Sequence, residues 1–187
     1  MTAINVIVLK DSVTIVSDTK AANPLGSDFN VSKVACIPHM EIALATRGKV
    51  GALDIVRRAV EQHAFDYASA RAYLADYYSR LGLAEVEVFL IGMTEEGPAA
   101  CMISKPNTDS KIVDIPNGVV TPTVSQEAFD VFAADLVAGM PELLNRQHEG
   151  HSSVGGFVCV TTVRRGSIET YVSGIIDELA WRAPLAA

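Results

Sequence analysis

Short apolar segments rich in β-branched residues, separated by polar turns, dominate the beginning of the chain. Residues 4–9 (INVIVL) and 13–17 (VTIVS) are two such segments, and the polar tripeptide 10–12 lies between them. β-Branched residues favour strands, whereas Asp and Ser favour turns, so the pattern predicts a β-hairpin. Because both strands are apolar nearly throughout, we expect them to lie in a sheet that is covered on both faces.

A loop and a second pair of strands follow this hairpin. Residues 22–30 contain Pro24 and Gly26, which interrupt regular structure, so we expect a loop there. Residues 33–37 and 41–46 are again short, apolar and separated by a turn, and they predict two further strands.

Helical periodicity replaces the strand pattern after these strands. Apolar residues recur at spacings of three and four from about Val50, which predicts a helix. A second helix is expected over 69–81, and Gly82 is placed to cap its C-terminus. The apolar faces are formed by Leu53, Val56, Val60 and Ala64 in the first helix, and by Leu74, Tyr77, Tyr78 and Leu81 in the second.

The second half of the chain returns to the hairpin pattern. Residues 85–92 and 98–104 predict one hairpin, and 157–163 and 167–172 predict another. A short strand is expected over 111–115. These segments are separated by glycine-containing or polar turns, which suit antiparallel neighbours.

A third helix is predicted between those two hairpins. Ser125 is a suitable N-cap for a helix that continues to about Gly139. Pro141 is expected to interrupt it, with a short helical continuation through Leu144, and the polar run 145–153 is expected to form a loop. The apolar face of this helix would contain Phe129, Phe132, Ala133, Leu136 and Met140.

This order of elements predicts the fold class. Strands that occur as consecutive hairpins indicate antiparallel sheets, and the helices are expected to cover the outer faces of those sheets. The prediction is therefore an α+β fold, a four-layer αββα sandwich of two antiparallel sheets. No repeat, low-complexity segment or linker divides the sequence, so we expect residues 1–187 to form a single domain.

Composition narrows the classes of function. With 187 residues, 49% of them apolar and 20% charged, the chain can bury a sizeable core. Its net charge of −7 argues against nucleic acid or an anionic membrane as a partner. We find no apolar run long enough to span a bilayer and no secretory signal. Three separated cysteines, Cys36, Cys101 and Cys159, are typical of reduced thiols, so we expect a cytoplasmic protein.

Thr2 is the first residue with candidate chemistry. Removal of Met1 would leave Thr2 with a hydroxyl and a free α-amine, and one such residue can supply both nucleophile and base. A threonine at this position is also common in proteins that make no use of it. Taken alone, Asp18 is equally well a turn residue, Lys33 an exposed lysine, and Gly48 a hinge between strand and helix.

Several short motifs together resemble the N-terminal nucleophile hydrolases, specifically the proteasome β-subunits and their simpler bacterial homologues. These motifs are Thr2, SDTKAA at 17–22, Lys33 within FNVSKVACI, IALATRGKVGA around Gly48, and SSVGGFVCVTTVRRGSIETYV near the end of the chain. Asp18 lies 16 residues after Thr2, which is the spacing of that family. The resemblance covers nearly the whole chain in element order, and it implies the four-layer architecture and assembly into stacked rings.

The resemblance also implies a role for each motif. Thr2 would attack a carbonyl carbon while its own α-amine relays the proton, and Asp18 and Lys33 would form a supporting charge pair. The backbone N–H of Gly48 would stabilise the oxyanion, because glycine lets a substrate approach the backbone closely. Arg47 and Lys49 flank this glycine and are expected to select acidic or carboxylate groups. Such a reaction needs no cofactor, and none is expected.

The late Gly-Gly segment departs from the family pattern. The family has an aspartate four residues before the Gly-Gly and a serine immediately before it, whereas this chain has His151 and Val154 there. Ser153 or His151 is a candidate substitute, and Glu149 is a candidate acid. The family's Gly-Ser-Gly loop before its third helix is also absent from the sequence.

Histidines in this region also raise the question of a metal site. His148, Glu149 and His151 are close in sequence, but their spacing suits a loop and no third ligand position is clear, so we expect no metal. No phosphate-binding loop or dinucleotide motif is present.

Three hypotheses about function remain open from the sequence. The first is a threonine-type peptidase that acts on a peptide or a small amide. The second is a catalytically silent subunit of the same fold that acts through assembly or binding; His151 and Val154 favour it, whereas the lack of an added helix before the first strand disfavours it. The third is an amidase for a small molecule. A homo-oligomer is expected from the resemblance, with a ring as one arrangement, and an ATP-dependent unfoldase as partner is left open.

Overall fold

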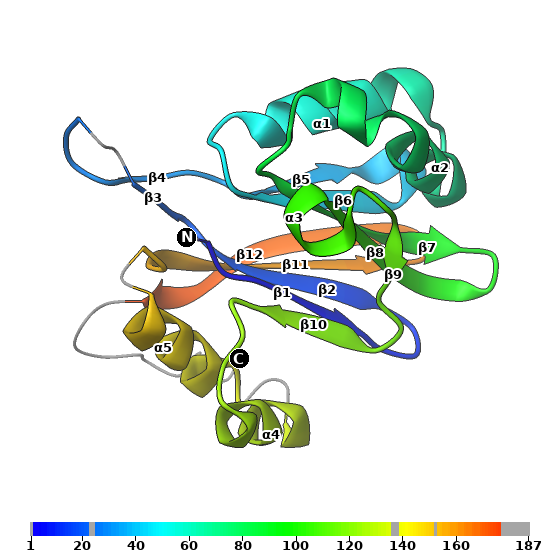
Figure 1. Ribbon diagram of the computed structural model, residues 1–187. Coiled ribbons are helices and arrows are strands. Elements are labelled where there is room, and N and C mark those ends of the chain that lie inside the picture. The colour runs from blue at the N-terminus through cyan, green and yellow to red at the C-terminus, as the bar shows by residue number, and fades with distance from the viewer. Residues whose placement is uncertain (1, 23–24, 136–138, 152, 177–187) are drawn as a thin grey trace.

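Two antiparallel sheets, packed face to face, form the middle of the protein (Figure 1). The computed structural model describes residues 2–22, 25–135, 139–151 and 153–176. The first sheet has the strand order β10-β1-β2-β11-β12, and the second has the order β5-β6-β7-β8-β9. All neighbouring strands in both sheets are antiparallel.

Each sheet is built mainly from strands that follow one another in the chain. The first sheet contains β1 (Ile4–Val8), β2 (Val13–Asp18), β10 (Gly118–Thr121), β11 (Gly156–Arg164) and β12 (Ser167–Ile176). The second contains β5 (Val34–Ile37), β6 (Ile42–Arg47), β7 (Glu87–Thr94), β8 (Gly97–Ser104) and β9 (Val113–Asp114). The predicted hairpins are therefore confirmed, and the short turn η1 (Pro38–Met40) joins β5 to β6.

Helices cover the outer faces of both sheets, which confirms the four-layer α+β architecture (Figure 1). Helices α1 (Ala52–His63) and α2 (Tyr67–Tyr77) pack on the second sheet. Helices α4 (Gln126–Ala134) and α5 (Met140–Gly150) pack on the first. A short helix, α3 (Lys105–Thr108), follows β8.

Alternating side chains explain why the strands are apolar throughout. In β6 and β7, Ala43 and Phe89 face the other sheet, whereas Leu44 and Leu90 face the helices, and all four are fully buried. Successive side chains of a strand point to opposite faces, so a sheet that is covered on both sides needs apolar residues at every position. The predicted helix faces are confirmed at their centres: Val56, Val60, Leu74, Tyr78 and Phe132 are buried, while Tyr77 and Phe129 are exposed.

The expected loop at 22–30 includes one short strand. Lys20–Ala21 (β3) pairs with Phe29–Asn30 (β4), and these two strands extend away from the body of the protein (Figure 1). The prediction of an entirely irregular segment is therefore wrong at its end, because backbone pairing stabilises two residues that have no strand pattern of their own.

The second helix begins earlier than predicted. It starts at Tyr67, and Asp66 is its N-cap. The Asp66 side chain accepts a hydrogen bond from the Ser69 N–H, and the Ser69 hydroxyl accepts one from the Asp66 N–H, which forms a capping box. The helix tightens into a 3₁₀ turn, η2 (Tyr78–Leu81), and ends at Gly82, whose φ of 69° confirms the predicted glycine cap.

Helix α5 occupies residues 145–150 of the predicted loop at 145–153. Pro141 lies in the first turn of a new helix, where a missing N–H costs nothing, and the helix continues to Gly150. Ion pairs from Arg146 to Glu142 and Glu149 lie on its exposed side, while Leu143, Leu144 and Gln147 are buried. The polar run is therefore the solvent face of an amphipathic helix. Ser125 caps α4 as predicted, whereas Leu136 of the expected helix lies outside the described residues.

Strand β10 was not predicted at all. Its four residues pair with β1, so that Ile4 lies opposite Thr121 and Val6 lies opposite Val119. None of the described helices is both long and apolar enough to cross a membrane.

Candidate functional site

Asp18 lies at the end of β2, where the β1–β2 register places it beside the residues that precede β1. The side chain is completely buried. Its Oδ1 accepts a hydrogen bond from the backbone N–H of Ala3 at 2.8 Å, and its Oδ2 accepts one from Gly155 N–H at 3.0 Å. Asp18 therefore fixes the backbone next to Thr2 and joins it to the turn that precedes β11.

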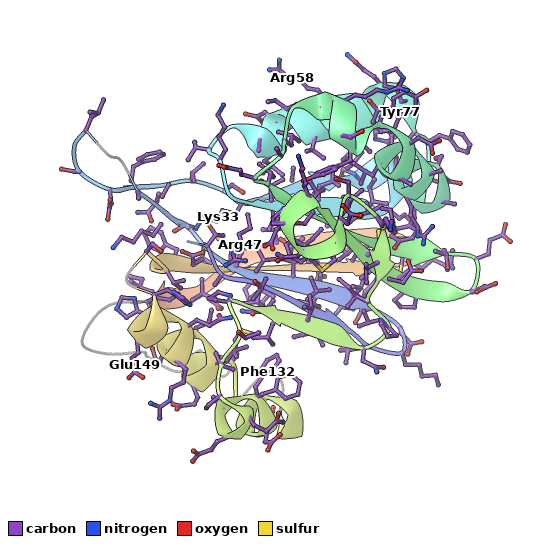
Figure 2. All side chains as sticks on the ribbon, viewed as in Figure 1. Lys33, Arg47, Arg58, Tyr77, Phe132 and Glu149 are labelled. Atoms are coloured by element: carbon purple, nitrogen blue, oxygen red, sulfur yellow. The ribbon has the colours of Figure 1, made fainter. Side chains whose placement is uncertain are left out.

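Lys33 binds the same carboxylate from the other sheet. It lies immediately before β5 and is only 7% exposed. Its Nζ donates to Asp18 Oδ1 at 2.7 Å and to the carbonyl oxygen of Lys20 at 2.6 Å. The Lys33 ammonium and the Ala3 amide thus share one oxygen atom, so the structure brings Thr2, Asp18 and Lys33 together at one end of the two sheets. In Figure 2, Lys33 and Arg47 lie at this end.

Burial and pairing act in opposite directions on the two charges. Burial lowers the pKa of Lys33, and the neighbouring Asp18 carboxylate offsets part of that effect. Burial likewise raises the pKa of Asp18, against the opposing effects of Lys33 and of the Gly155 and Ala3 N–H groups. A buried ammonium whose pKa is lowered gives up its proton more readily than an exposed lysine does.

A cavity of about 530 Å³ lies over this pair, and we call it the site cavity. Thr2, Lys33 and Gly48 line it, together with the backbone segments that follow β2 and β6. Thr2 is only 8% exposed, so it is a buried residue of the cavity wall. The volume is within the range of about 300–1,000 Å³ that small-molecule sites occupy.

Gly48 occupies a position that only glycine can fill. Its φ is +129°, which side-chain-bearing residues rarely adopt, and a Cβ there would lie 2.5 Å from the carbonyl oxygen of Glu85. The backbone of Gly48 therefore packs directly on the segment before β7 while it forms part of the cavity wall. This close packing explains the glycine without reference to a substrate.

Arg47 does not present a free charge to the cavity, contrary to the sequence-based expectation. Its Nη1 lies 2.8 Å from Glu87 Oε2, and the buried Glu87 also accepts a hydrogen bond from Asn107. The positive charge of Arg47 is therefore compensated by the carboxylate of Glu87. Lys49 lines the same cavity and is exposed, so it is the residue of this pair that presents a positive charge at the rim.

The backbone of the late Gly-Gly turn contacts Asp18 and Lys20, but no described residue of this turn is among those that line the site cavity. Val154 is fully buried among the apolar residues beneath α5, and Ser153, which is half-buried, is not among the residues that line the site cavity. His151 lines a different cavity, and Glu149 forms an ion pair with Arg146. His151 and Glu149 therefore have other surroundings than the site cavity, and the role of Ser153 beside Thr2 stays a prediction.

Metal ligation is not favoured by the same segment. His148 Nδ1 lies 2.7 Å from the carbonyl oxygen of Val154, and Glu149 is paired with Arg146. Across the described ranges, no group of three His, Cys, Asp or Glu side chains lies close enough to hold an ion.

Two contributors to the site were missed by sequence reasoning. One is the pair of backbone donors, Ala3 and Gly155, whose only sequence signals are the hairpin spacing and the Gly-Gly motif. The other is a buried amide pair beneath β1. Asn5 and Gln147 exchange hydrogen bonds of 3.0 and 2.8 Å, and Gln147 also donates to Pro122. This pair holds the strand that follows Thr2 against α5.

Comparison with known proteins supports the fold. No protein-family model matches the chain, and no curated protein matches it in sequence. A solved structure, the Gly-1 mutant of Anbu from Hyphomicrobium sp. strain MC1, superposes with a TM-score of 0.72. The alignment covers 92% of this chain and 88% of that one at 10% sequence identity, a similarity that bears on the fold alone. The chain therefore shares its fold with Anbu, a proteasome-like protein.

Proposed function

We propose that the protein is an N-terminal nucleophile amidohydrolase in which Thr2 attacks the carbonyl carbon of a peptide or a small amide. The observation that carries the proposal is the site cavity, which brings Thr2, Lys33 and Gly48 together above the buried Asp18. The fold shared with a proteasome-like protein is consistent with this chemistry but does not by itself imply it.

The proposed reaction requires the α-amine of Thr2 to be free. Met1 lies outside the described residues, so its removal is part of the proposal. The amine takes the proton from Thr2 Oγ as Oγ bonds to the carbonyl carbon. Collapse of the tetrahedral intermediate breaks the C–N bond, and the leaving amine receives that proton. Water then hydrolyses the resulting ester, releases the acid and restores the threonine hydroxyl.

Lys33 and Asp18 would act through position and charge. The ammonium of Lys33 favours the deprotonated hydroxyl of Thr2 and disfavours a second positive charge on its amine. Asp18 holds that ammonium and also binds the N–H of Ala3, the residue next to the nucleophile. Gly48 would donate its N–H to the oxyanion from the cavity wall.

A silent assembly or binding subunit is the second candidate. Val154 favours it, because an apolar, fully buried side chain stands where the resembling family has a hydroxyl that helps to orient the terminal amine. We also propose that the protein is a homo-oligomer under either function. Native mass spectrometry should therefore find a mass that is a multiple of 19.9 kDa, and a monomer at micromolar concentration would contradict this.

Two measurements test the catalytic proposal. Intact-mass analysis should find the chain without Met1, because retention of Met1 blocks the amine. Thr2→Ala should lower hydrolysis of fluorogenic peptides by at least about 10³-fold and abolish labelling by an electrophilic inhibitor. Thr2→Ser is the matched control, since it keeps both hydroxyl and amine and should retain labelling. Equal hydrolysis by the wild type and Thr2→Ala would refute the proposal.

A further inference from the structure

A second cavity, of about 430 Å³, adjoins the site cavity, and we call it the side cavity. Arg47, Glu87 and Asn107 line both cavities. These three side chains are connected by the Arg47–Glu87 ion pair and the Asn107–Glu87 hydrogen bond. The two spaces are therefore separated by a polar partition of three residues and not by a layer of backbone.

The two cavities are lined by segments from the two neighbours of β1, the strand that begins two residues after Thr2. In the first sheet β1 lies between β10 and β2. The residues that follow β2 form part of the site cavity, and residues 119–123 in and after β10 form part of the side cavity. Because Ile4 lies opposite Thr121, the residues just after Thr121 lie beside the start of β1. A substrate whose carbonyl group is held at Thr2 can therefore extend in two directions.

The wall of the side cavity is mainly apolar. Phe89, Met102, Val119 and Val120 contribute to it, with Pro122 and His151 at its edges. The buried Gln147 donates to the carbonyl oxygen of Pro122 at 2.8 Å, which fixes this edge against α5. An apolar cavity with a fixed wall suits an apolar side chain.

The partition also contains a buried hydrogen-bond donor. Arg47 Nη1 is bound to Glu87, but its Nε–H is buried and has no hydrogen-bond partner within the part of the chain that the structure describes. Because this Nε–H has almost no accessible surface, it belongs to the interior of the partition and not to the wall that a substrate would contact.

On this basis we propose that the side cavity is a second substrate subsite, which takes an apolar side chain on the other side of the scissile amide from the group in the site cavity. This inference rests on the proposed amidohydrolase function. It implies that the preferred substrates are peptides with a bulky apolar residue at that position, rather than amides of a single residue.

Methyl NMR on the inactive Thr2→Ala protein tests occupancy of the side cavity without any need for turnover. Met102 lines that cavity, whereas Met40 and Met93 are buried in the two neighbouring cores and serve as internal references. The Met102 signal is assigned by its loss in Met102→Leu. Two peptides are added that differ only in Leu or Ala after the scissile bond. The Leu peptide should shift the Met102 signal in a saturable way, and the Ala peptide should shift it less.

Kinetics on the active protein give the second arm. The ratio of kcat/KM for the Leu peptide over the Ala peptide should be about 10-fold or more in the wild type. Val119→Phe, which fills the side cavity, should bring the ratio close to one. Val113→Phe makes the same change at an exposed position of β9 outside both cavities and should keep the wild-type ratio.

The two arms separate failure of the subsite from failure of the function. Absence of a Met102 shift, or equal shifts of Met40 and Met93, would overturn the subsite, as would a Leu-to-Ala ratio that Val119→Phe leaves intact. A specific Met102 shift without hydrolysis by the wild type would keep the subsite as a peptide-binding site and refute the amidohydrolase.

Discussion

Asp18→Asn tests whether the buried charge pair stabilises the site. The Asp18 carboxylate accepts three hydrogen bonds, two at Oδ1 from Ala3 and Lys33 and one at Oδ2 from Gly155. An asparagine has one carbonyl oxygen, so it can accept at only one of these two places. Its NH₂ group would then face the N–H of Gly155 or both donors at the other oxygen.

The magnitude follows from two contributions. Removing one partner of a buried ion pair costs about 3–5 kcal/mol, and a buried N–H without an acceptor costs about 1–3 kcal/mol. Lys33 keeps its contact with the Lys20 carbonyl oxygen and lines the site cavity, which reduces the first contribution. We therefore expect a loss of about 3 kcal/mol in the free energy of unfolding, which corresponds to a fall in Tm of roughly 6–12 °C for a chain of this size.

Urea denaturation followed by circular dichroism measures this loss at pH 7. Glu169→Gln is the matched control, because it makes the same chemical change in the exposed Arg164–Glu169 pair, whose atoms are 3.2 Å apart. The control should cost less than about 0.5 kcal/mol. A loss below about 1 kcal/mol for Asp18→Asn would refute the reasoning, since the pair would then contribute no more than a surface contact.

The stability of the Asp18→Asn variant should also depend on pH. Asp18 raises the pKa of Lys33, so its removal leaves burial to lower that pKa further. In the unfolded chain Lys33 has the ordinary lysine pKa. At a pH between the lowered pKa of the folded state and this ordinary pKa, the unfolded chain therefore binds more protons than the folded one, and the free energy of unfolding rises with pH. Asp18→Asn should therefore regain part of its lost stability between pH 7 and pH 10. A difference from the wild type that stays constant with pH would contradict this account.

Three further predictions concern other parts of the structure. Gly48→Ala should lower the free energy of unfolding by about 1–3 kcal/mol in urea titrations, because its Cβ would lie 2.5 Å from the Glu85 carbonyl oxygen; an unchanged midpoint would contradict this. Gln147→Ala should cost about 2–3 kcal/mol in the same assay, because the buried Asn5 Nδ2 loses the acceptor Gln147 Oε1 and Asn5 Oδ1 loses the donor Gln147 Nε2; a midpoint equal to that of the wild type would refute this. Burial raises the pKa of the Cys101 thiol to about 11, so this thiol should not react with a disulfide reagent at pH 8 until urea unfolds the chain, and rapid labelling of the folded protein would be inconsistent with its burial.

Local patterns were sufficient for most of the fold because most strands pair with their neighbours in sequence. The opening hairpin is the clearest case, since its turn sets the register that places Asp18 beside Ala3. Strand β10 escaped prediction because its partner β1 is distant: Asn5 and Thr121, which are hydrogen-bonded, are 116 residues apart. Pairing over such a distance leaves no periodic signal in four residues.

The second half of helix α5, after the predicted helical continuation through Leu144, was missed for a related reason. Its apolar positions are few, and the contact that buries Gln147 is made with Asn5, 142 residues away. The exposed face is stabilised by Arg146 and its two glutamates, which in the sequence are simply a polar run. Tertiary packing therefore determines this helix more than its own composition does.

The candidate site shows the same division between local and distant information. Thr2 and Asp18 follow from the hairpin, and Lys33 was identified only through the resemblance to the proteasome group. The compensation of Arg47 by Glu87, 40 residues away, could not be predicted, because charges that pair across strands leave no spacing rule. That compensation is what turns an expected carboxylate-binding residue into part of the partition between two cavities.

In the turn before β11, the backbone contacts the charge pair, whereas the side chains of Val154 and His151 face other surroundings. Gly155 donates its N–H to Asp18, so the turn remains part of the site even though Val154 is buried in the core and His151 lines the side cavity. The aspartate and serine of the resembling family are thus replaced in this turn by His151 and Val154, while the contact of the turn with the charge pair is present. Under the proposed function, Asp18 then links this turn to Lys33 and to the backbone beside Thr2. We therefore expect hydrolysis to be lost together with this pair in Asp18→Asn.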